Sequence, residues 1–304
     1  MPTISKELNL KLYQTGLLLG IFSGGPGIVM GFIGGSVVDK IGARYGGLLI
    51  TKYEIREICK VTGLKPYQQE KFYMETVILR LLYSETSDLI YKGGTSLFMF
   101  SHLPRFSDDL DFNVDGDINL TSIMKKVSRG MDVLGIHHNY RFLNENEISR
   151  SFWFSIEGPL YTTPVSRITV KIDLSYREKT IMPTIINTYN PVYSDLLPFD
   201  VISMDPEEIL NEKVRAVITR NKARDLFDIY FLLKNYKLNL DKEIIKEKLG
   251  YYNLEFSLDE FKLSIEKKRY MWDQELNPIL LVSLPNFNDV VTFVMEKAEK
   301  DLIR

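Results

Sequence analysis

The stretch over residues 92–112 constrains the fold of this 304-residue chain more than any other. It opens with two glycines, Gly93 and Gly94, at the start of a short apolar helix pattern, and it ends with Asp109 and Asp111, which alternate with apolar residues as in a strand. A helix start exposes free backbone N–H groups that attract phosphate, and side chains two apart on a strand project from one face. The stretch therefore predicts two carboxylates on a strand beside a helix start.

The aspartate pair indicates a bound cation. Two adjacent carboxylates repel each other unless a cation neutralises them, and Mg²⁺ is usually held by one or two carboxylates plus substrate phosphate oxygens. The glycines let a phosphate approach the backbone, and Thr95, Ser96 and Ser107 add hydroxyls. Alone, the glycines fit any tight turn, and Asp109 and Asp111 fit a solvated acidic turn. Together they predict a site for a metal-bound nucleoside triphosphate.

Charged residues later in the chain are candidates for the same site. Asp173 lies in an alternating strand pattern and fits either a third metal ligand or a solvent-facing strand residue. Lys213 lies beside an apolar helical stripe, and Asp225 and Asp228 are three apart, so they can share a helix face. These helical charges fit a surface salt-bridge ladder. They also fit a clamp in which Lys213 contacts the triphosphate and an aspartate orients it or polarises the acceptor.

The composition excludes several classes of protein. The chain is 45% hydrophobic and 26% charged, which is typical of a globular protein with a buried core. Its net charge of -2 argues against a strongly basic nucleic-acid binder but leaves room for a local basic groove. The single cysteine, Cys59, excludes an internal disulfide, and with three histidines it makes a structural zinc site unexpected. We expect a cytoplasmic protein.

The first 50 residues differ from the rest of the chain. They hold 11 of the 19 glycines, and the 27 residues from 12 to 38 carry no charge. That span exceeds the roughly 20 residues needed to cross a bilayer. Its end resembles the loop after the second membrane helix of major facilitator superfamily transporters, at Gly35, Asp39, Lys40, Gly42 and Arg44. Because a single helix cannot form a transport pathway, we expect a fused fragment or a misplaced start more than a membrane anchor.

The rest of the chain first mixes helix and strand patterns and then becomes helical. Helices are predicted over 53–61, 66–82, 95–101 and 120–134, and strands over 88–91, 110–114, 150–156 and 166–174. After Asp205-Pro206, helices are predicted over 206–219, 223–235, 240–249, 258–269 and 286–302. We therefore expect an α+β protein with a glycine-rich, membrane-helix-like segment (1–48), a core (49–204) and a helical C-terminal domain (205–304).

These motifs, in this order, resemble those of the AbiEii/AbiGii toxin family, nucleotidyltransferase-like proteins of toxin–antitoxin and phage-exclusion systems. Residues 62–71 resemble the family's G-L-x-x-x-x-x-E-K stretch, residues 92–97 its K-G-G-T-x-L, and residues 105–111 its R-x-S-x-D-x-D. Residues 212–213 and 224–228 resemble its E-K and R-D-x-x-D motifs. The resemblance spans about residues 50–235.

The resemblance implies a fold and a set of residue roles. The fold is a polymerase-β-like nucleotidyltransferase core, a small mixed sheet with flanking helices, followed by a helical part. The implied catalytic residues are Asp109, Asp111, Lys213 and Asp225, and the implied Mg²⁺ ligands are Asp109, Asp111 and Asp173. We expect the nucleotide to contact Lys92, Gly93, Gly94, Thr95, Ser96, Arg105, Ser107 and Asp228.

The implied activity is that of a Mg²⁺-dependent toxin which transfers a nucleoside monophosphate from a nucleoside triphosphate, such as ATP or GTP, to an acceptor hydroxyl. RNA is the implied acceptor, for example the 3′ end of tRNA, and a cognate antitoxin is the implied partner. Three alternatives stay open. The acceptor could be a small molecule or a protein, the site could bind nucleotide without catalysis, or residues 12–38 could associate with a membrane.

Overall fold

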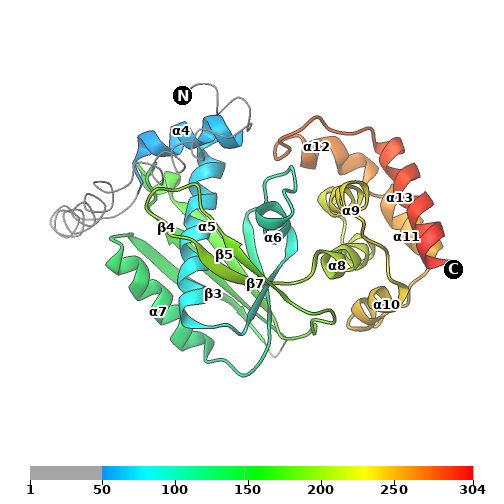
Figure 1. Ribbon diagram of the computed structural model, residues 1–304, viewed down its shortest axis with the longest axis horizontal. Coiled ribbons are helices and arrows are strands. Elements are labelled where there is room, and N and C mark those ends of the chain that lie inside the picture. The colour runs from blue at the N-terminus through cyan, green and yellow to red at the C-terminus, as the bar shows by residue number, and fades with distance from the viewer. Residues whose placement is uncertain (1–49, 147, 304) are drawn as a thin grey trace, which may run out of the picture. The chain divides into compact units, whose positions relative to one another are not determined.

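A seven-stranded mixed sheet organises residues 50–146 and 148–303, the part of the chain that the computed structural model describes (Figure 1). The strands follow the order β3-β4-β5-β2-β1-β7-β6, and the β2/β5 and β1/β7 pairs are parallel while the others are antiparallel. The strands are β1 (Leu89–Lys92), β2 (Asp109–Val114), β3 (His138–Glu145), β4 (Ser149–Ile156), β5 (Ile168–Ser175), β6 (Ile185–Tyr189) and β7 (Phe199–Ser203).

The helices fall into two groups along the chain (Figure 1). The first group accompanies the sheet and consists of α4 (Lys52–Thr62), α5 (Pro66–Glu85), α6 (Gly93–Phe100) and α7 (Leu120–Val133). The second group follows the last strand and consists of α8 (Pro206–Thr219), α9 (Ala223–Asn235), α10 (Lys242–Gly250), α11 (Leu258–Glu266), α12 (Trp272–Leu276) and α13 (Phe287–Leu302). Short 3₁₀ turns occupy Pro164–Ser166 and Arg269–Met271.

Residues at the ends of α4, α5 and α8 explain where these helices begin or end. The α4 helix begins with a reciprocal capping box between Thr51 and Glu54 and ends at Gly63, whose φ of 76° suits a residue without a Cβ. The α5 helix has Pro66 in its first turn, where a missing N–H costs nothing. Asp205 accepts a hydrogen bond from the Glu207 N–H and so caps α8.

Two hydrophobic clusters hold these layers together. In the first, α5 and α7 bury the apolar face of the sheet, including Leu110 and Phe112 from β2 and Phe152 and Phe154 from β4. In the second, α8, α9 and α13 pack with the other C-terminal helices. Because α6 contributes Leu97 to the second cluster and Met99 to the first, this short helix lies between the two.

The α+β prediction is confirmed, and its individual elements agree to different degrees. The helices predicted over 206–219 and 223–235 coincide with α8 and α9, and the predicted strand over 110–114 begins one residue earlier, at Asp109. Strands β3, β6 and β7 were missed. Among them, β6 and β7 are five residues long, and in β6 no residue is buried, so the apolar alternation that reveals a strand is weak.

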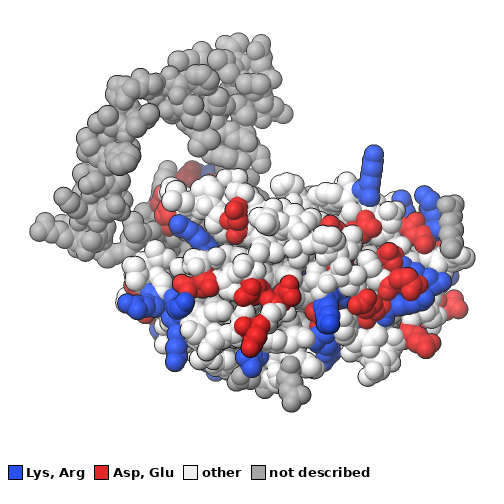
Figure 2. Space-filling view, turned by 60° about the horizontal axis from the view of Figure 1, so that its bottom comes forward, with Lys and Arg blue, Asp and Glu red and all other residues white. Residues whose placement is uncertain are grey.

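Acidic and basic side chains are interspersed over the face shown in Figure 2, without a broad patch of one sign. No helix within residues 50–146 and 148–303 has the length and apolar character needed to span a membrane. The uncharged span 12–38 and the transporter-like residues up to Arg44 lie outside the described residues.

Candidate functional site

The start of α6 is built for a close approach to its neighbours. Gly93 has a φ of 76°, and a Cβ added there would lie 2.5 Å from Asp111 Oδ2. A Cβ on Gly94 would lie 2.6 Å from Arg105 Nη2 and 2.7 Å from Ser107 Oγ. No side chain caps this helix start. The two glycines therefore bring the free N–H groups of α6 directly beside a carboxylate and a hydroxyl.

Asp109 and Asp111 share one face of β2, as their spacing predicted, and both are partly exposed. Burial, with the neighbouring Asp109 and Asp173 carboxylates as further causes, raises the pKa of Asp111 to about 6. Burial and the neighbouring Asp108 also raise the pKa of Asp109 above its ordinary value. Both carboxylates are thus held where their negative charge is unfavourable.

The nearby lysines do not relieve this repulsion by direct pairing. Lys71 is bonded to Asp108 at 2.9 Å, and Lys171 is bonded to Asp173 at 2.6 Å. In the described part of the chain neither Asp109 nor Asp111 has an ion-pair partner. Two adjacent carboxylates that have no ion-pair partner, next to a helix start, have the donor chemistry that a divalent metal requires.

Asp173 lies opposite Asp111 on the adjacent strand β5, as a third carboxylate should. Its two oxygens are engaged, Oδ1 by the Ser151 hydroxyl and Oδ2 by Lys171 Nζ. Accordingly, no three His, Cys, Asp or Glu side chains among the described residues are grouped as a complete metal site. The arrangement fits a metal held by two carboxylates and completed by substrate oxygens, with Asp173 available if Lys171 moves.

The leading E-K motif supports the aspartate strand. The Glu70 carboxylate accepts a hydrogen bond from the Leu160 N–H and packs closely against Gly158, which fixes the loop before β5. Lys71 is 5% exposed and pairs with Asp108, the residue that precedes the metal-ligand candidates. The motif therefore acts through positioning.

The helical charges form a buried cluster. Asp225 and Asp228 are both fully buried. Lys213 Nζ lies 3.0 Å from Asp225 Oδ1 and 2.7 Å from Asp228 Oδ2. Arg105 donates two hydrogen bonds to Asp228, at 2.6 and 2.7 Å. The surface-ladder interpretation is therefore wrong, and the two aspartates serve as anchors for cations that come from different elements.

Burial by itself would raise the pKa of both anchors, but their cations outweigh it. Lys213 and Arg220 hold the pKa of Asp225 well below its usual range, and Arg105 and Lys213 lower that of Asp228. Since Asp225 is bonded to Lys213 and, at 2.7 and 2.8 Å, to Arg220, it holds two cationic groups in fixed positions. An ionised, buried Asp225 fits an orienting role and is too enclosed to touch an acceptor directly.

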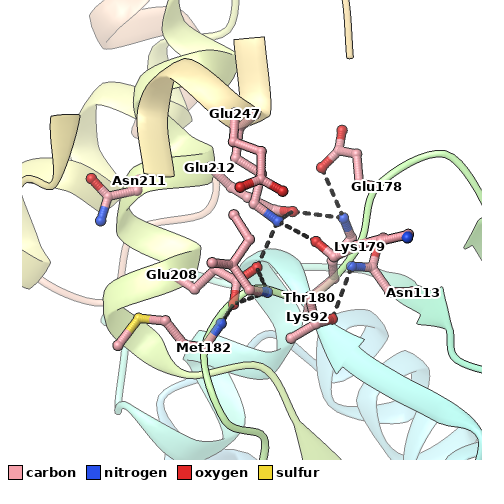
Figure 3. A network of polar contacts seen from close by, with 12 residues as sticks. Lys92, Asn113, Glu178, Lys179, Thr180, Met182, Glu208, Asn211, Glu212 and Glu247 are labelled. Atoms are coloured by element: carbon pink, nitrogen blue, oxygen red, sulfur yellow. Dashed lines mark hydrogen bonds and ion pairs between the residues drawn. The ribbon is translucent and has the colours of Figure 1, made fainter. Parts of the chain in front are cut away.

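Lys92 belongs to a second buried network (Figure 3). Its Nζ lies 2.9 Å from Glu212 and 3.5 Å from Glu178. Lys248, which is fully buried, pairs with Glu208 at 2.6 Å and Glu212 at 3.4 Å, and it donates to the Lys179 carbonyl. The network ties the end of β1 to α8, to α10 and to the segment after β5, so Lys92 is a positioning residue for the α6 start.

The hydroxyl groups that were expected to contact the nucleotide differ in their surroundings. The Thr95 hydroxyl donates to the Asp109 carbonyl at 2.7 Å and is buried, as Ser96 is. Ser107 is partly exposed and faces Gly94. A phosphate at the α6 start would therefore meet backbone N–H groups and Ser107, whereas Thr95 holds α6 against β2.

A pocket of about 180 Å³ opens next to this helix start. Its lining combines four cations with three carboxylates and an aromatic ring, and it includes Lys92, Gly93, Asp111, Ser175, Glu178, Glu212, Lys213, Arg215, Ala216, Arg220 and Tyr252. Of the cations that form ion pairs here, Arg220 has the most exposed side chain, at 48%. The pocket can therefore receive an anionic ligand against Lys213 and Arg220, with Asp111 at its wall.

Residues 80–292 match the family described as "Nucleotidyl transferase AbiEii toxin, Type IV TA system". The chain belongs to this family. It is a nucleotidyltransferase, and the family implies a nucleotide substrate and an antitoxin partner. Nucleotidyltransferases generally use divalent metals, in agreement with the unneutralised pair Asp109 and Asp111. No curated protein matches the chain.

Two solved structures from Helicobacter pylori share the fold of this AbiEii family member, and a third solved structure is similar to it. JHP933 from Helicobacter pylori is 21% identical, with a TM-score of 0.53, over 78% of this chain and 92% of that one. A putative nucleotidyltransferase from H. pylori is 21% identical, with a TM-score of 0.51, over 78% and 95%. MenT4, a nucleotidyltransferase toxin from Mycobacterium tuberculosis H37Rv, is 18% identical, with a TM-score of 0.48, over 78% and 75%.

Among the residues that line this pocket, Arg220 and Tyr252 were given no role from the sequence. Arg220 lies between the E-K and R-D-x-x-D motifs, and its position there was the available signal. Tyr252 follows α10, and the guanidinium groups of Arg177 and Arg215 lie 4.8 and 4.9 Å from its ring centre. Nothing in the local sequence distinguishes Tyr252 from the chain's other 16 tyrosines, because only the fold brings it to the pocket.

Proposed function

We propose that the protein transfers a nucleoside monophosphate from a Mg²⁺-bound nucleoside triphosphate to a hydroxyl group of RNA, and that this reaction is its toxic activity. One observation carries the proposal. The uncapped, glycine-rich start of α6 touches Asp111, and Asp111 and Asp109 form a carboxylate pair without an ion-pair partner in the described chain. A phosphate bound at the α6 start and a cation bound by the carboxylates would therefore be adjacent.

The residues would divide the work as follows. The α6 N–H groups and Ser107 bind phosphate oxygens, and Asp109 and Asp111 hold the metal ion, which would supply charge neutralisation and Lewis acidity. Lys213 and Arg220, both bonded to Asp225, line the same pocket and would contact the triphosphate there. The acceptor hydroxyl releases its proton to water as its oxygen forms a bond to the α-phosphorus and the bond to pyrophosphate breaks. Lys213 and Arg220 would stabilise the charge on the leaving group.

The test is incubation of the protein with each α-labelled nucleoside triphosphate, Mg²⁺ and total RNA. We expect label in RNA with the wild type and a loss of at least 100-fold with Asp109→Ala, because removing a metal ligand removes the charge stabilisation of the transition state. Asp117→Asn is the matched control, since Asp117 is an exposed aspartate beyond the opposite end of β2. Equal label transfer by Asp109→Ala would contradict the proposal.

Parallel reactions separate the acceptor classes. Replacing RNA with a metabolite extract or with total protein tests a small-molecule or protein acceptor. Tight binding of Mg²⁺ and nucleotide without pyrophosphate release would indicate a binding protein instead. In cells, we expect expression of the wild type to slow growth and expression of Asp109→Ala to leave it unchanged.

A further inference from the structure

The carboxylate site continues sideways onto the half-exposed face of three strands. In register, Asp109 of β2 lies opposite Lys171 of β5, Lys171 lies opposite Trp153 of β4, and Trp153 lies opposite Arg141 of β3. Side chains that are directly opposite in neighbouring strands project from the same face. One cross-strand row thus leads from a metal-ligand candidate through a lysine and a tryptophan to an arginine.

This face is the polar side of strands whose other side is core. In β4, Phe152, Phe154 and Ile156 are fully buried against α5 and α7, while Trp153 and its same-face neighbours are only partly buried. Arg141 and Asn139 of β3 are exposed. A tryptophan on the solvent side of a sheet is costly in water and is available for stacking.

The surface here is hollowed. Two pockets of about 320 Å³ each share Asn139 and Ser155. One is lined by Trp153, Arg141 and Thr169, and the other by His137, Glu157 and Arg167. Together they extend the row into a shallow trough that runs away from Asp109.

The chemistry of the trough matches single-stranded nucleic acid. The Arg141 guanidinium lies over the Trp153 ring, 4.9 Å from its centre, so the two groups form a stack that a base can extend. Lys171 and Arg167 have side chains that are 43% and 36% exposed and can reach phosphates. Each is paired with a carboxylate, so their attraction for phosphate at a distance is weak and contact must be local.

We propose that the unpaired 3′-terminal segment of an RNA acceptor lies in this trough, with a base stacked on Trp153 and Arg141. Neighbouring strands are about 4.8 Å apart, so Trp153 lies ~10 Å from Asp109 across the sheet. A base there would be one or two nucleotides from the terminal hydroxyl that meets Asp109 and Asp111. The inference rests on the proposed nucleotidyl transfer and names the surface that delivers its acceptor.

The chain offers an intrinsic probe for this surface. It has two tryptophans, and Trp272 is 3% exposed in the helical core, so a base that stacks on Trp153 should quench the accessible part of the emission. The experiment titrates the full chain with a short single-stranded RNA that carries a 5′ fluorescein and a free 3′-hydroxyl. It records tryptophan emission with an unlabelled copy and anisotropy with the labelled one, in the absence of nucleotide.

We expect Trp153→Ala to weaken RNA binding by about tenfold, the effect of losing one stacked base at about 1–3 kcal/mol. Trp153→Phe should keep most of the affinity while the emission change disappears. Arg141→Lys should weaken binding although it keeps the charge, because lysine lacks the planar group. Arg129→Ala is the matched control, since Arg129 is exposed on α7, on the opposite side of the sheet.

The outcomes separate this proposal from the catalytic one. In transfer assays, Trp153→Ala should raise KM for RNA while kcat and nucleotide binding stay within about twofold of the wild type. If the wild type transfers label to RNA and Trp153→Ala binds RNA as tightly as the wild type does, the proposed trough is wrong and the proposed activity stands. If RNA binding depends on Trp153 but no label is transferred, the proposed activity is wrong and the RNA-binding trough stands. Transfer to a protein acceptor, with no RNA binding at Trp153, would overturn the trough.

Discussion

At the scale of single residues, the fold makes the ionisation of one site carboxylate unfavourable. Asp111 lies against the Gly93 backbone and near Asp109 and Asp173, and its pKa is about 6 compared with an ordinary value of 3.8. A folded-state pKa above the unfolded value means that ionisation destabilises the fold. The cost is absent below pH 3.8, develops as the pH rises from 3.8 to about 6, and is complete above that.

Asp111→Asn should therefore stabilise the metal-free protein at pH 7 by about 1–3 kcal/mol while it abolishes transfer. Urea unfolding of both proteins from pH 4 to 8 checks this. The difference in unfolding free energy should shrink as the pH falls from about 6 to 4, because folded Asp111 becomes protonated and the unfolded carboxyl approaches its ordinary pKa of 3.8. A variant that is less stable than the wild type at pH 7 would show that the carboxylate is neutralised by something other than a bound metal.

At the scale of elements, buried ion pairs join α9 to the turn before β2. Arg105 is 1% exposed, and residues around it are held by backbone bonds from Phe106 to Ile279 and from Leu281 to Pro104. Asp228 on α9 is the bidentate partner of Arg105. The turn that carries Ser107 and Asp109 is thus fixed from the helical side, so the helical part positions the carboxylates.

We expect Asp228→Ala to destabilise the protein by about 3–5 kcal/mol, because Arg105 would remain buried without a partner. Glu266→Ala is the control. It removes a carboxylate from an exposed pair with Arg269, at 43% and 42% exposure, and should cost less than about 1 kcal/mol. Denaturant midpoints compare the two. Full stability of Asp228→Ala with lost activity would instead assign Asp228 a direct contact with the nucleotide.

At the scale of the whole molecule, every proposed site residue belongs to the compact unit that begins at Leu49. Ile50 is 4% exposed within its core, and Thr51 caps α4. A version of the chain that starts at Leu49 should therefore fold with the stability of the full chain and retain nucleotidyl transfer. Thermal unfolding and the labelled-nucleotide assay test this. Loss of transfer by a well-folded shortened chain would give residues 1–48 a part in the reaction.

The strength of the local signals explains which elements were predictable. The α8 and α9 boundaries follow from Asp205-Pro206 and from an apolar stripe of helical period, which are properties of neighbouring residues. The exposed sides of β3 and β6 give no such period, and their strand state depends on pairing with β4 and β7. The same holds for Tyr252 and Trp153, whose places at the pocket and the trough depend on other elements.

The sequence by itself determined the two-glycine helix start, the carboxylate pair on one face of β2 and the order of the helical part, because spacing along the chain fixes direction within one element. Tertiary structure decided which charges are free. It buried Asp225 and Asp228 as anchors, engaged Lys92 and Arg105 in ion pairs, and left Asp109 and Asp111 without any in the described chain. The physical reason is that burial and pairing depend on contacts between residues far apart in sequence, as the 123-residue separation of Arg105 and Asp228 shows.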